Sequence, residues 1–286
     1  MNKNILRVFP SRTSCTPDDD MVWIGLPGLF VPEHEEVHIS CVFTWDIDYC
    51  EYLLETWREH TDKPVYLGGP AYGSKCDEHT PGLYTKAGII FTSRGCNNKC
   101  PWCLVPKREG RLQELEVKPG HIINDNNFLQ CSERHQEKVF EMLGGQKNIQ
   151  FKGGLECGLV TREFAKKARE VKTSEIWLAC DTDSRLPDLK KAAGILQEAG
   201  FTRNHIHCYV LIGRDMDKEE KRLQEIYKAG CMPFAQLYKP VQAKEYSVEW
   251  KRFARQWSRA AAVIAHVEKG TTYKTQEAND EQFDTL

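Results

Sequence analysis

The sequence predicts an α/β fold: a partial (βα)6 TIM-like barrel, preceded by a small α/β domain and followed by a C-terminal helix. Three observations predict it. From about residue 84 onward, short apolar, β-rich runs alternate with helical runs, which is typical of parallel βα units. This region has about 150 residues, too few for an eight-fold barrel of roughly 250. A separate group of strand and helix signals precedes it, and an amphipathic run follows it.

The small domain is predicted over residues 1–83. Its strand signals are three apolar runs: Ile5–Phe9, Val37–Thr44 and Pro64–Leu67. Between the last two, Asp46–Glu59 carries apolar side chains three and four positions apart, as an amphipathic helix does. Strand, helix and strand in that order predict a βαβ unit, which ends at the turn residues Gly68-Gly69-Pro70.

The barrel is predicted over residues 84–245. Its strands are expected at Ala87–Thr92, His121–Asn124, Asn148–Lys152, Glu175–Ala179, His207–Ile212 and Phe234–Tyr238. Its helices are expected at Glu133–Leu143, Arg162–Val171, Leu186–Ala199 and Lys218–Ala229. Because the functional side chains of such barrels gather where the strands end, the chemistry is expected at those positions.

Residues 246–286 are predicted to form a C-terminal helix and a polar tail. The helix Val248–Glu268 would carry large apolar side chains, Trp257 among them, along one stripe, with its basic residues off that stripe. Two interpretations stay open. The stripe docks the helix on the barrel, or the basic face around Arg255 contacts nucleic acid.

The composition sets limits on function. The 286 residues carry 39 basic and 41 acidic side chains, a net charge of −2, which argues against a strongly electrostatic polyanion binder. No apolar run approaches the ~20 residues of a membrane helix, and Met1–Pro10 lacks the apolar core of a signal peptide. We therefore expect a cytoplasmic protein without membrane contact. There the 12 cysteines stay reduced, so clustered ones are expected to be metal ligands or catalytic thiols.

Cys96, Cys100 and Cys103 form a close cluster, with the spacing Cys-x3-Cys-x2-Cys, directly after the first predicted barrel strand. Gly95 and Pro101 let this loop turn tightly. Three thiolates without a nearby fourth ligand leave a tetrahedral zinc site incomplete. A [4Fe–4S] cluster tolerates one iron without a protein ligand. Zinc with a distant fourth ligand remains the structural alternative.

In these residues the chain resembles the radical S-adenosylmethionine (radical SAM) superfamily, which has this cysteine spacing in this place, with an aromatic residue such as Trp102 before the last cysteine. The resemblance implies a [4Fe–4S] cluster whose open iron binds S-adenosylmethionine (SAM). It implies reductive cleavage of SAM to a 5′-deoxyadenosyl radical that abstracts hydrogen from a substrate. The implied partner is an electron donor such as flavodoxin or ferredoxin. A non-catalytic zinc or redox iron–sulfur protein is the alternative of another class.

The same resemblance assigns cofactor contacts to residues near the strand ends. Lys152–Glu156 resembles the Gly-Gly-Glu element that meets the amino group of SAM, although it follows the third predicted barrel strand rather than the second. Asn124–Phe128 resembles a stretch found near SAM or substrate, and plain turns at both places remain open. The implied cofactor-binding residues are Trp102, Asp125, Gly153, Gly154, Glu156, Asp181, Asp183 and Gly213.

Four cysteines outside the cluster are expected to have catalytic or structural roles. Cys157 and Cys180 fall at predicted strand ends, where either could donate a hydrogen atom, and buried wall cysteines are the alternative. Cys131 and Cys208 are expected to be structural.

Two further resemblances concern accessory cofactors. Thr92–Leu115 is similar to tRNA-modifying methylthiotransferases, which hold a second iron–sulfur cluster on three cysteines of an N-terminal α/β domain. Cys15, Cys41 and Cys76 are the candidates for such a cluster here. The small domain also resembles a shrunken cobalamin-binding domain, without the Asp-x-His-x-x-Gly loop that binds cobalamin through histidine.

The substrate expected from these resemblances is a nucleobase or nucleotide, free or within DNA or RNA. Its support is the methylthiotransferase-like loop, with Lys107, Arg108 and Arg111, and the basic face near Arg255. A peptide or small metabolite is the alternative, and transferase, lyase and oxidoreductase chemistry all remain open. The overall pattern also resembles a radical SAM group common in phage and prophage genomes.

Overall fold

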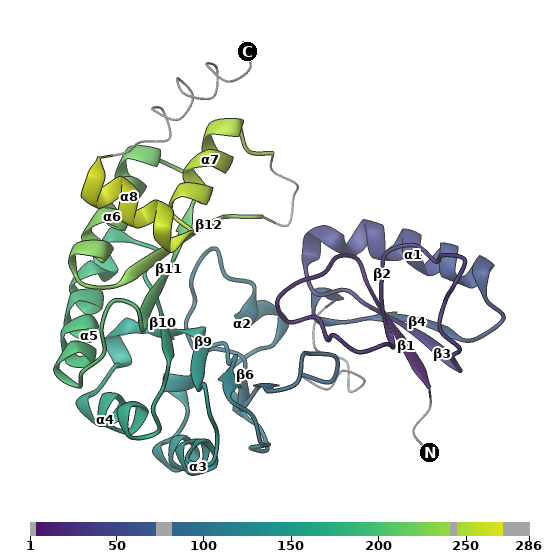
Figure 1. Cartoon of the computed structure of the whole chain (residues 1–286), viewed down its shortest axis with the longest axis horizontal. Coiled ribbons are helices and arrows are strands. Elements are labelled where there is room, and N and C mark those ends of the chain that lie inside the picture. Colours follow the sequence, from purple (N-terminus) through teal and green to yellow (C-terminus); the bar gives the residue numbers. More distant parts are fainter. Residues whose placement is uncertain (1–3, 73–81, 241–244, 271–286) are drawn as a thin grey trace.

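The computed structural model describes residues 4–72, 82–240 and 245–270 (Figure 1). Within these ranges, no helix is both long and apolar enough to cross a membrane. The described chain forms two parallel sheets of four and six strands and one antiparallel strand pair. The predicted α/β class with parallel strands is thereby confirmed.

The N-terminal sheet has the strand order β2-β1-β3-β4, and every pairing in it is parallel. Its strands are β1 (Ile5–Phe9), β2 (Val22–Ile24), β3 (Glu36–Ser40) and β4 (Val65–Gly68). Helix α1 (Ile47–His60) joins β3 to β4, as predicted, and buries Leu53 and Trp57 against the alternate inward residues of β1 and β3. The short strand β2 was not predicted, because three residues give too little pattern.

The six-stranded sheet is parallel throughout and follows the chain order, β12-β11-β10-β9-β8-β5. Its strands are β5 (Ile89–Ile90), β8 (Ile122–Ile123), β9 (Gln150–Glu156), β10 (Glu175–Ala179), β11 (Ile206–Ile212) and β12 (Met232–Leu237). The helices that join them are α3 (Glu133–Leu143), α4 (Arg162–Glu170), α5 (Leu186–Glu198) and α6 (Met216–Lys228). Figure 1 shows these helices along one face of the sheet. β5 and β12 are its two edges.

The two faces of this sheet carry different side chains. Strand β11 alternates buried residues, which join the core beneath the helices, with half-buried ones. On the other face, Trp177 stacks on His207 and Tyr209, each with ring centroids 4.5 Å apart, and meets Phe234 edge to face. The face away from the helices is therefore lined by aromatic rings.

The C-terminal stretch forms two helices, α7 (Val248–Gln256) and α8 (Ala260–Lys269), so the prediction of one continuous helix is wrong. The chain breaks at Trp257–Arg259, where Arg259 has an extended backbone, and the carbonyl of Trp257 accepts a hydrogen bond from the N–H of Ala235 at 3.0 Å. Phe253 and Trp257 are fully buried in the core of the six-stranded sheet. The predicted apolar stripe is thus a packing surface.

The N-terminal unit contacts the chain beside both edges of the six-stranded sheet. Before β5, the N–H of Lys86 donates to the carbonyl of Cys15 at 2.8 Å, in the loop after β1. After β12, the ammonium of Lys239 lies 4.2 Å from the ring centre of Trp45. The N-terminal unit therefore bridges the open side of the sheet.

Candidate functional site

The cysteine loop is closed at its base by a strand pair that was not predicted. β6 (Ser93–Arg94) pairs antiparallel with β7 (Gln113–Glu114), and a single helical turn, α2 (Val105–Arg108), lies between them. Gly95 turns the chain at a φ of +80°, and a Cβ there would overlap the carbonyl of Arg111. The loop therefore folds tightly around the predicted metal ligands.

The three predicted ligands Cys96, Cys100 and Cys103 are all half-buried. Burial raises the pKa of Cys100, and the nearby thiols of Cys103 and Cys96 raise it further. Burial likewise raises the pKa of Cys103, with Cys96 adding to the effect and a hydrogen bond from the N–H of Val105 opposing it. In the described ranges, no three or more histidine, cysteine, aspartate or glutamate side chains are arranged to hold a single metal ion. The thiols converge without surrounding one point.

The segment after β8 clamps the start of the loop. Asp125 is only 1% exposed, and its carboxylate accepts hydrogen bonds from the backbone N–H of Thr92 at 2.6 Å and the hydroxyl of Ser93 at 2.9 Å. Burial raises the pKa of Asp125, and these donors oppose the rise. The next residue, Asn126, accepts from the N–H of Gly95 at 3.0 Å. The predicted site residue Asp125 therefore positions the loop from beneath.

A cage of amide side chains links Cys96 to Glu156. The backbone N–H of Asn98 and the side-chain amide of Asn127 point at Cys96 Sγ, at 3.5 and 3.8 Å. Three side-chain amides donate to Glu156 Oε2: Asn98 at 2.8 Å, Asn127 at 2.9 Å and Gln130 at 3.1 Å. Asn127 Oδ1 is buried and accepts no hydrogen bond from any residue that the structure describes. An unsatisfied acceptor therefore lies beside the cysteine loop.

The Gly-Gly-Glu element lies inside a strand, which corrects its expected position after one. β9 continues through Gly153 and Gly154 and ends at Glu156. A Cβ on Gly153 would overlap the carbonyl oxygen of Asp125, and Gly154 has a φ of +83°. The two glycines let β9 approach the clamp closely, which brings Glu156 to Asn127.

Asp181, directly after β10, fixes another part of the site. Its carboxylate accepts from the indole N–H of Trp102 at 3.2 Å and the backbone N–H of Leu211 at 2.9 Å, while Arg222 donates to its carbonyl at 2.8 Å. Burial raises the pKa of Asp181, and these donors and Arg222 oppose the rise. The guanidinium of Arg214 lies 5.0 Å from the centre of the Trp102 ring. The structure thus brings together Trp102 and Asp181.

The last two predicted cofactor contacts differ in their surroundings. Asp183 has a side chain 61% exposed and pairs with Arg222 at 3.4 Å. Gly213, after β11, has a φ of +122°, and a Cβ there would collide with the ring of Tyr246, so glycine is required. Its N–H donates to the buried carboxylate of Glu219 at 2.9 Å. Gly213 is firmly held at the strand end, whereas Asp183 extends outward.

The two candidate hydrogen donors lie in the hydrophobic core. Cys157 and Cys180 are 5% and 0% exposed. The thiol of Cys157 donates to the carbonyl of Ala179 at 3.2 Å. Burial raises the pKa of Cys157 and raises that of Cys180 to about 12. Both are buried as expected for wall cysteines, which was the alternative interpretation. Cys208 is fully buried in the same core.

Of the three candidates for a second cluster, Cys15 and Cys41 lie in the described chain, where the two thiols make no hydrogen bond with each other. The thiol of Cys41 is fully buried, and its hydrogen bond with Cys50 on α1, together with burial, raises the pKa of Cys41. Cys15 lies in the loop after β1, half-buried. Cys76 falls outside the described residues. The electrostatic neighbour of Cys41 is therefore Cys50 rather than Cys15.

The amide cage could not be predicted from the sequence. Asn98, Asn127 and Gln130 lie in loop or turn segments, where asparagine and glutamine are ordinary. Comparison of the chain with models of known protein families finds no match. A comparison with curated proteins finds no match either.

Proposed function

We propose that this protein is a radical SAM enzyme whose [4Fe–4S] cluster is held by Cys96, Cys100 and Cys103. In the proposal, the six-stranded sheet forms the wall of a partial (βα)6 barrel. The observation that supports it most is the clamped cysteine loop, which follows the first strand of a parallel sheet arranged in chain order. Barrel enzymes carry their functional loops at the C-terminal ends of their strands.

The donor set fits a cluster of this kind. Thiolates are the usual ligands of iron–sulfur clusters, and a cubane distributes them over different irons rather than around one ion. Cys96, Cys100 and Cys103 supply three such thiols on one tightly folded loop, and all three are half-buried. The N–H groups of Asn98 and Asn127 that are directed at Cys96 Sγ could also donate hydrogen bonds to the sulfur of a cluster-bound cysteine.

The surroundings of Cys96 also fit the polar end of SAM. The Glu156 carboxylate and the buried Oδ1 of Asn127 are both hydrogen-bond acceptors beside the loop, so a ligand amino group would find partners there. Trp102, Asp181 and Gly213 would hold the nucleoside part at the ends of β10 and β11. In this assignment Asp125 and Gly153 position the loop rather than touch the cofactor.

When bound, the reduced cluster and SAM supply a carbon-centred radical that can abstract hydrogen from a substrate. The contribution of the chain itself is to orient the substrate and to exclude water from the site. Trp177, Tyr209 and Phe234 line the sheet face away from the helices with aromatic rings. The electron donor would be a flavodoxin or ferredoxin, and the substrate a nucleobase or nucleotide rather than a peptide.

The proposal is tested by anaerobic purification and iron analysis. Wild-type protein should be brown and contain about four irons per chain. Replacing Cys96, Cys100 and Cys103 by alanine should remove the colour and the iron. Cys15→Ala is the matched control and should leave both unchanged. A colourless zinc protein would contradict the proposal, and about eight irons would indicate a second cluster.

A further inference from the structure

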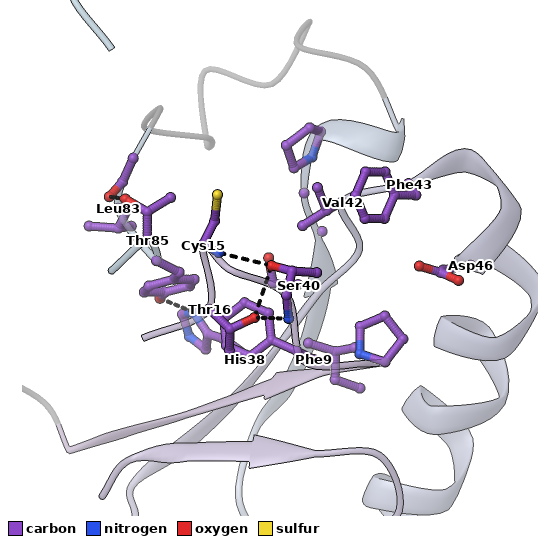
Figure 2. Close-up of a pocket in the computed structure, with 18 of the residues that line it drawn as sticks. Phe9, Cys15, Thr16, His38, Ser40, Val42, Phe43, Asp46, Leu83 and Thr85 are labelled. Atoms are coloured by element: carbon purple, nitrogen blue, oxygen red, sulfur yellow. Dashed lines mark hydrogen bonds between the residues drawn. The ribbon is translucent and has the colours of Figure 1, made fainter. Parts of the chain in front are cut away.

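A second candidate site lies at the carboxyl edge of the N-terminal sheet, separate from the three thiols of the cysteine loop. Here a cavity of about 780 Å³, the sheet-edge cavity, is lined by the ends of β1, β3 and β4 (Figure 2). In the order β2-β1-β3-β4, the connections of β1 and β3 leave in opposite directions. Open parallel sheets bind ligands in the crevice at such a switch point, and small organic ligands occupy cavities of this size.

Aromatic rings form much of the cavity wall. Phe9 at the end of β1, Phe43 before the turn η1 (Thr44–Asp46), Tyr66 on β4 and Tyr84 line it from different sides. Figure 2 shows Phe43 beside Val42, and Phe9 near His38. Aromatic faces favour a flat, unsaturated ring over a branched aliphatic group. The shape of the wall therefore favours a planar ligand.

A hydrogen-bond chain sets the polarity of one wall. Glu36 only accepts, so His38 Nε2 carries the proton that it shares with Glu36 at 3.2 Å. His38 Nδ1 then accepts from the hydroxyl of Tyr84 at 2.6 Å. Because Tyr84 donates its proton to His38, its oxygen meets a ligand as an acceptor.

A carboxylate adds a second acceptor. Asp46, on η1, lines the cavity, and its side chain makes no hydrogen bond within the described chain. Two backbone donors of the loop after β1 are already used. The N–H of Cys15 bonds to the hydroxyl of Thr13 at 3.2 Å, and that of Thr13 bonds to the hydroxyl of Thr16 at 2.9 Å. A ligand with N–H donors matches this wall.

The charges of the cavity disfavour phosphate. Among the described lining residues Arg94 is the only lysine or arginine, and its guanidinium pairs with Glu109 while lying 4.8 Å from the centre of the Phe91 ring. Glu36 and Asp46 add negative charge. Among the described lining residues, a phosphate would therefore find no uncommitted cation, which costs free energy. Lys239, outside the lining, acts electrostatically on Asp46.

We propose that the sheet-edge cavity binds a small planar heteroaromatic molecule that carries N–H donors and no phosphate, the chemistry of a nucleobase or nucleoside. The cavity borders Phe91, Arg94 and Asn124, which lead into the cysteine loop and its clamp. This position makes the bound molecule the substrate, a step that rests on the proposed function.

One glycine offers a way to block the cavity without disturbing the fold. Gly68 lines it at the end of β4, and a Cβ there would have no atom within 4 Å. Gly69 is unsuitable, because a Cβ would overlap the carbonyl of Cys41. Gly194 on α5, which is equally open but outside the cavity, is the matched control.

The test is calorimetric titration of the full chain, kept anaerobic, with cytidine, guanosine and their 5′-monophosphates. We expect both nucleosides to bind, and each monophosphate to bind at least about tenfold more weakly. Gly68→Leu should weaken nucleoside binding about tenfold or more, while Gly194→Leu should not change it. Asp46→Asn should reduce the difference in affinity between nucleoside and monophosphate, because it removes a negative charge that repels the phosphate.

The proposal would be overturned by the absence of nucleoside binding, by tighter binding of the monophosphates, or by unchanged binding in folded Gly68→Leu. SAM cleavage without substrate, measured as 5′-deoxyadenosine, separates this outcome from the proposed function. Cleavage without nucleoside binding would contradict only the assignment of the cavity. Binding without cleavage would leave the cavity intact and contradict the radical SAM function.

Discussion

Asp125 has the most constrained carboxylate near the cysteine loop, since it is 1% exposed and bonds to both Thr92 and Ser93. Asp125→Ala should lower the free energy of unfolding by about 1–3 kcal/mol, because it leaves buried donors without an acceptor. It should also lower the iron content of the purified protein. Urea unfolding and iron analysis measure the two effects.

Asp183→Ala is the control for this prediction. Its side chain is 61% exposed, and Arg222 keeps its hydrogen bond to the Asp181 carbonyl, so the change in stability should stay within about 0.5 kcal/mol. Equal losses in the two variants would show that Asp125 does not hold the loop.

His207 predicts a pH dependence of stability. It stacks on Trp177, and burial lowers the pKa of His207 below its ordinary 6.5. His207 therefore binds a proton more readily in the unfolded chain than in the folded protein. Its contribution to stability is complete above about pH 6.5, and it is lost as the pH falls through the lowered pKa of His207 in the folded protein.

His207→Phe keeps the ring and should remove this part of the pH dependence. Urea unfolding at about pH 7.5 and 5.5 would show a smaller fall in the variant than in the wild type. An identical fall in both proteins would mean that His207 titrates as it does in the unfolded chain.

At the scale of single residues, the cysteine ligands and Asp125 could be identified from the sequence, but the amide side chains that hold Glu156 could not. Cys96 and Asp125 stand in short patterns with clear chemistry, and the structure places them together. Asn127 and Gln130 could not be singled out, because their roles depend on β9 reaching them from a distant part of the chain. The buried state of Cys157 and Cys180 likewise depends on which side of the sheet the helices cover.

At the scale of elements, the long periodic segments were predictable and the short ones were not. Helices α1 and α3 have several turns of regular apolar spacing, and both were expected near their observed bounds. β2 and β6 have too few residues to show a pattern. The break between α7 and α8 keeps Phe253, Trp257 and Val263 in one core, so periodicity alone did not reveal it.

Strand β9 gives a prediction at this scale. Gly153→Ala should lower the melting temperature and the iron content, because a Cβ would push β9 away from Asp125. Gly194→Ala is the matched substitution on α5, where the Cβ enters open space. It should raise stability by about 0.5–1 kcal/mol. If Gly153→Ala retains full iron and stability, close approach of β9 is not required.

At the scale of the whole molecule, the N-terminal unit joins the two edges of the six-stranded sheet. Its own core, with Leu53 and Trp57, is separate from the core that holds Phe253. The contacts of Cys15 with Lys86 and of Trp45 with Lys239 link the units. The sequence indicated two units but not this bridge, because neither contact leaves a periodic signal.

A double-mutant cycle tests the bridge. Lys239→Ala and Trp45→Ala should show a coupling of about 0.5–1 kcal/mol in the free energy of unfolding, the value of a surface cation–π contact. Lys239→Ala combined with Tyr52→Ala, an exposed residue of α1, should be additive. Additivity in both cycles would mean that the two units do not meet at Trp45.

In the proposed function, the clamped cysteine loop supports reductive cleavage of SAM. The most direct measurement is the yield of 5′-deoxyadenosine from anaerobic protein, dithionite and SAM. We predict formation of 5′-deoxyadenosine and methionine by the wild type and none by the variant lacking Cys96, Cys100 and Cys103. A protein that carries its full iron content but yields no 5′-deoxyadenosine would contradict this account.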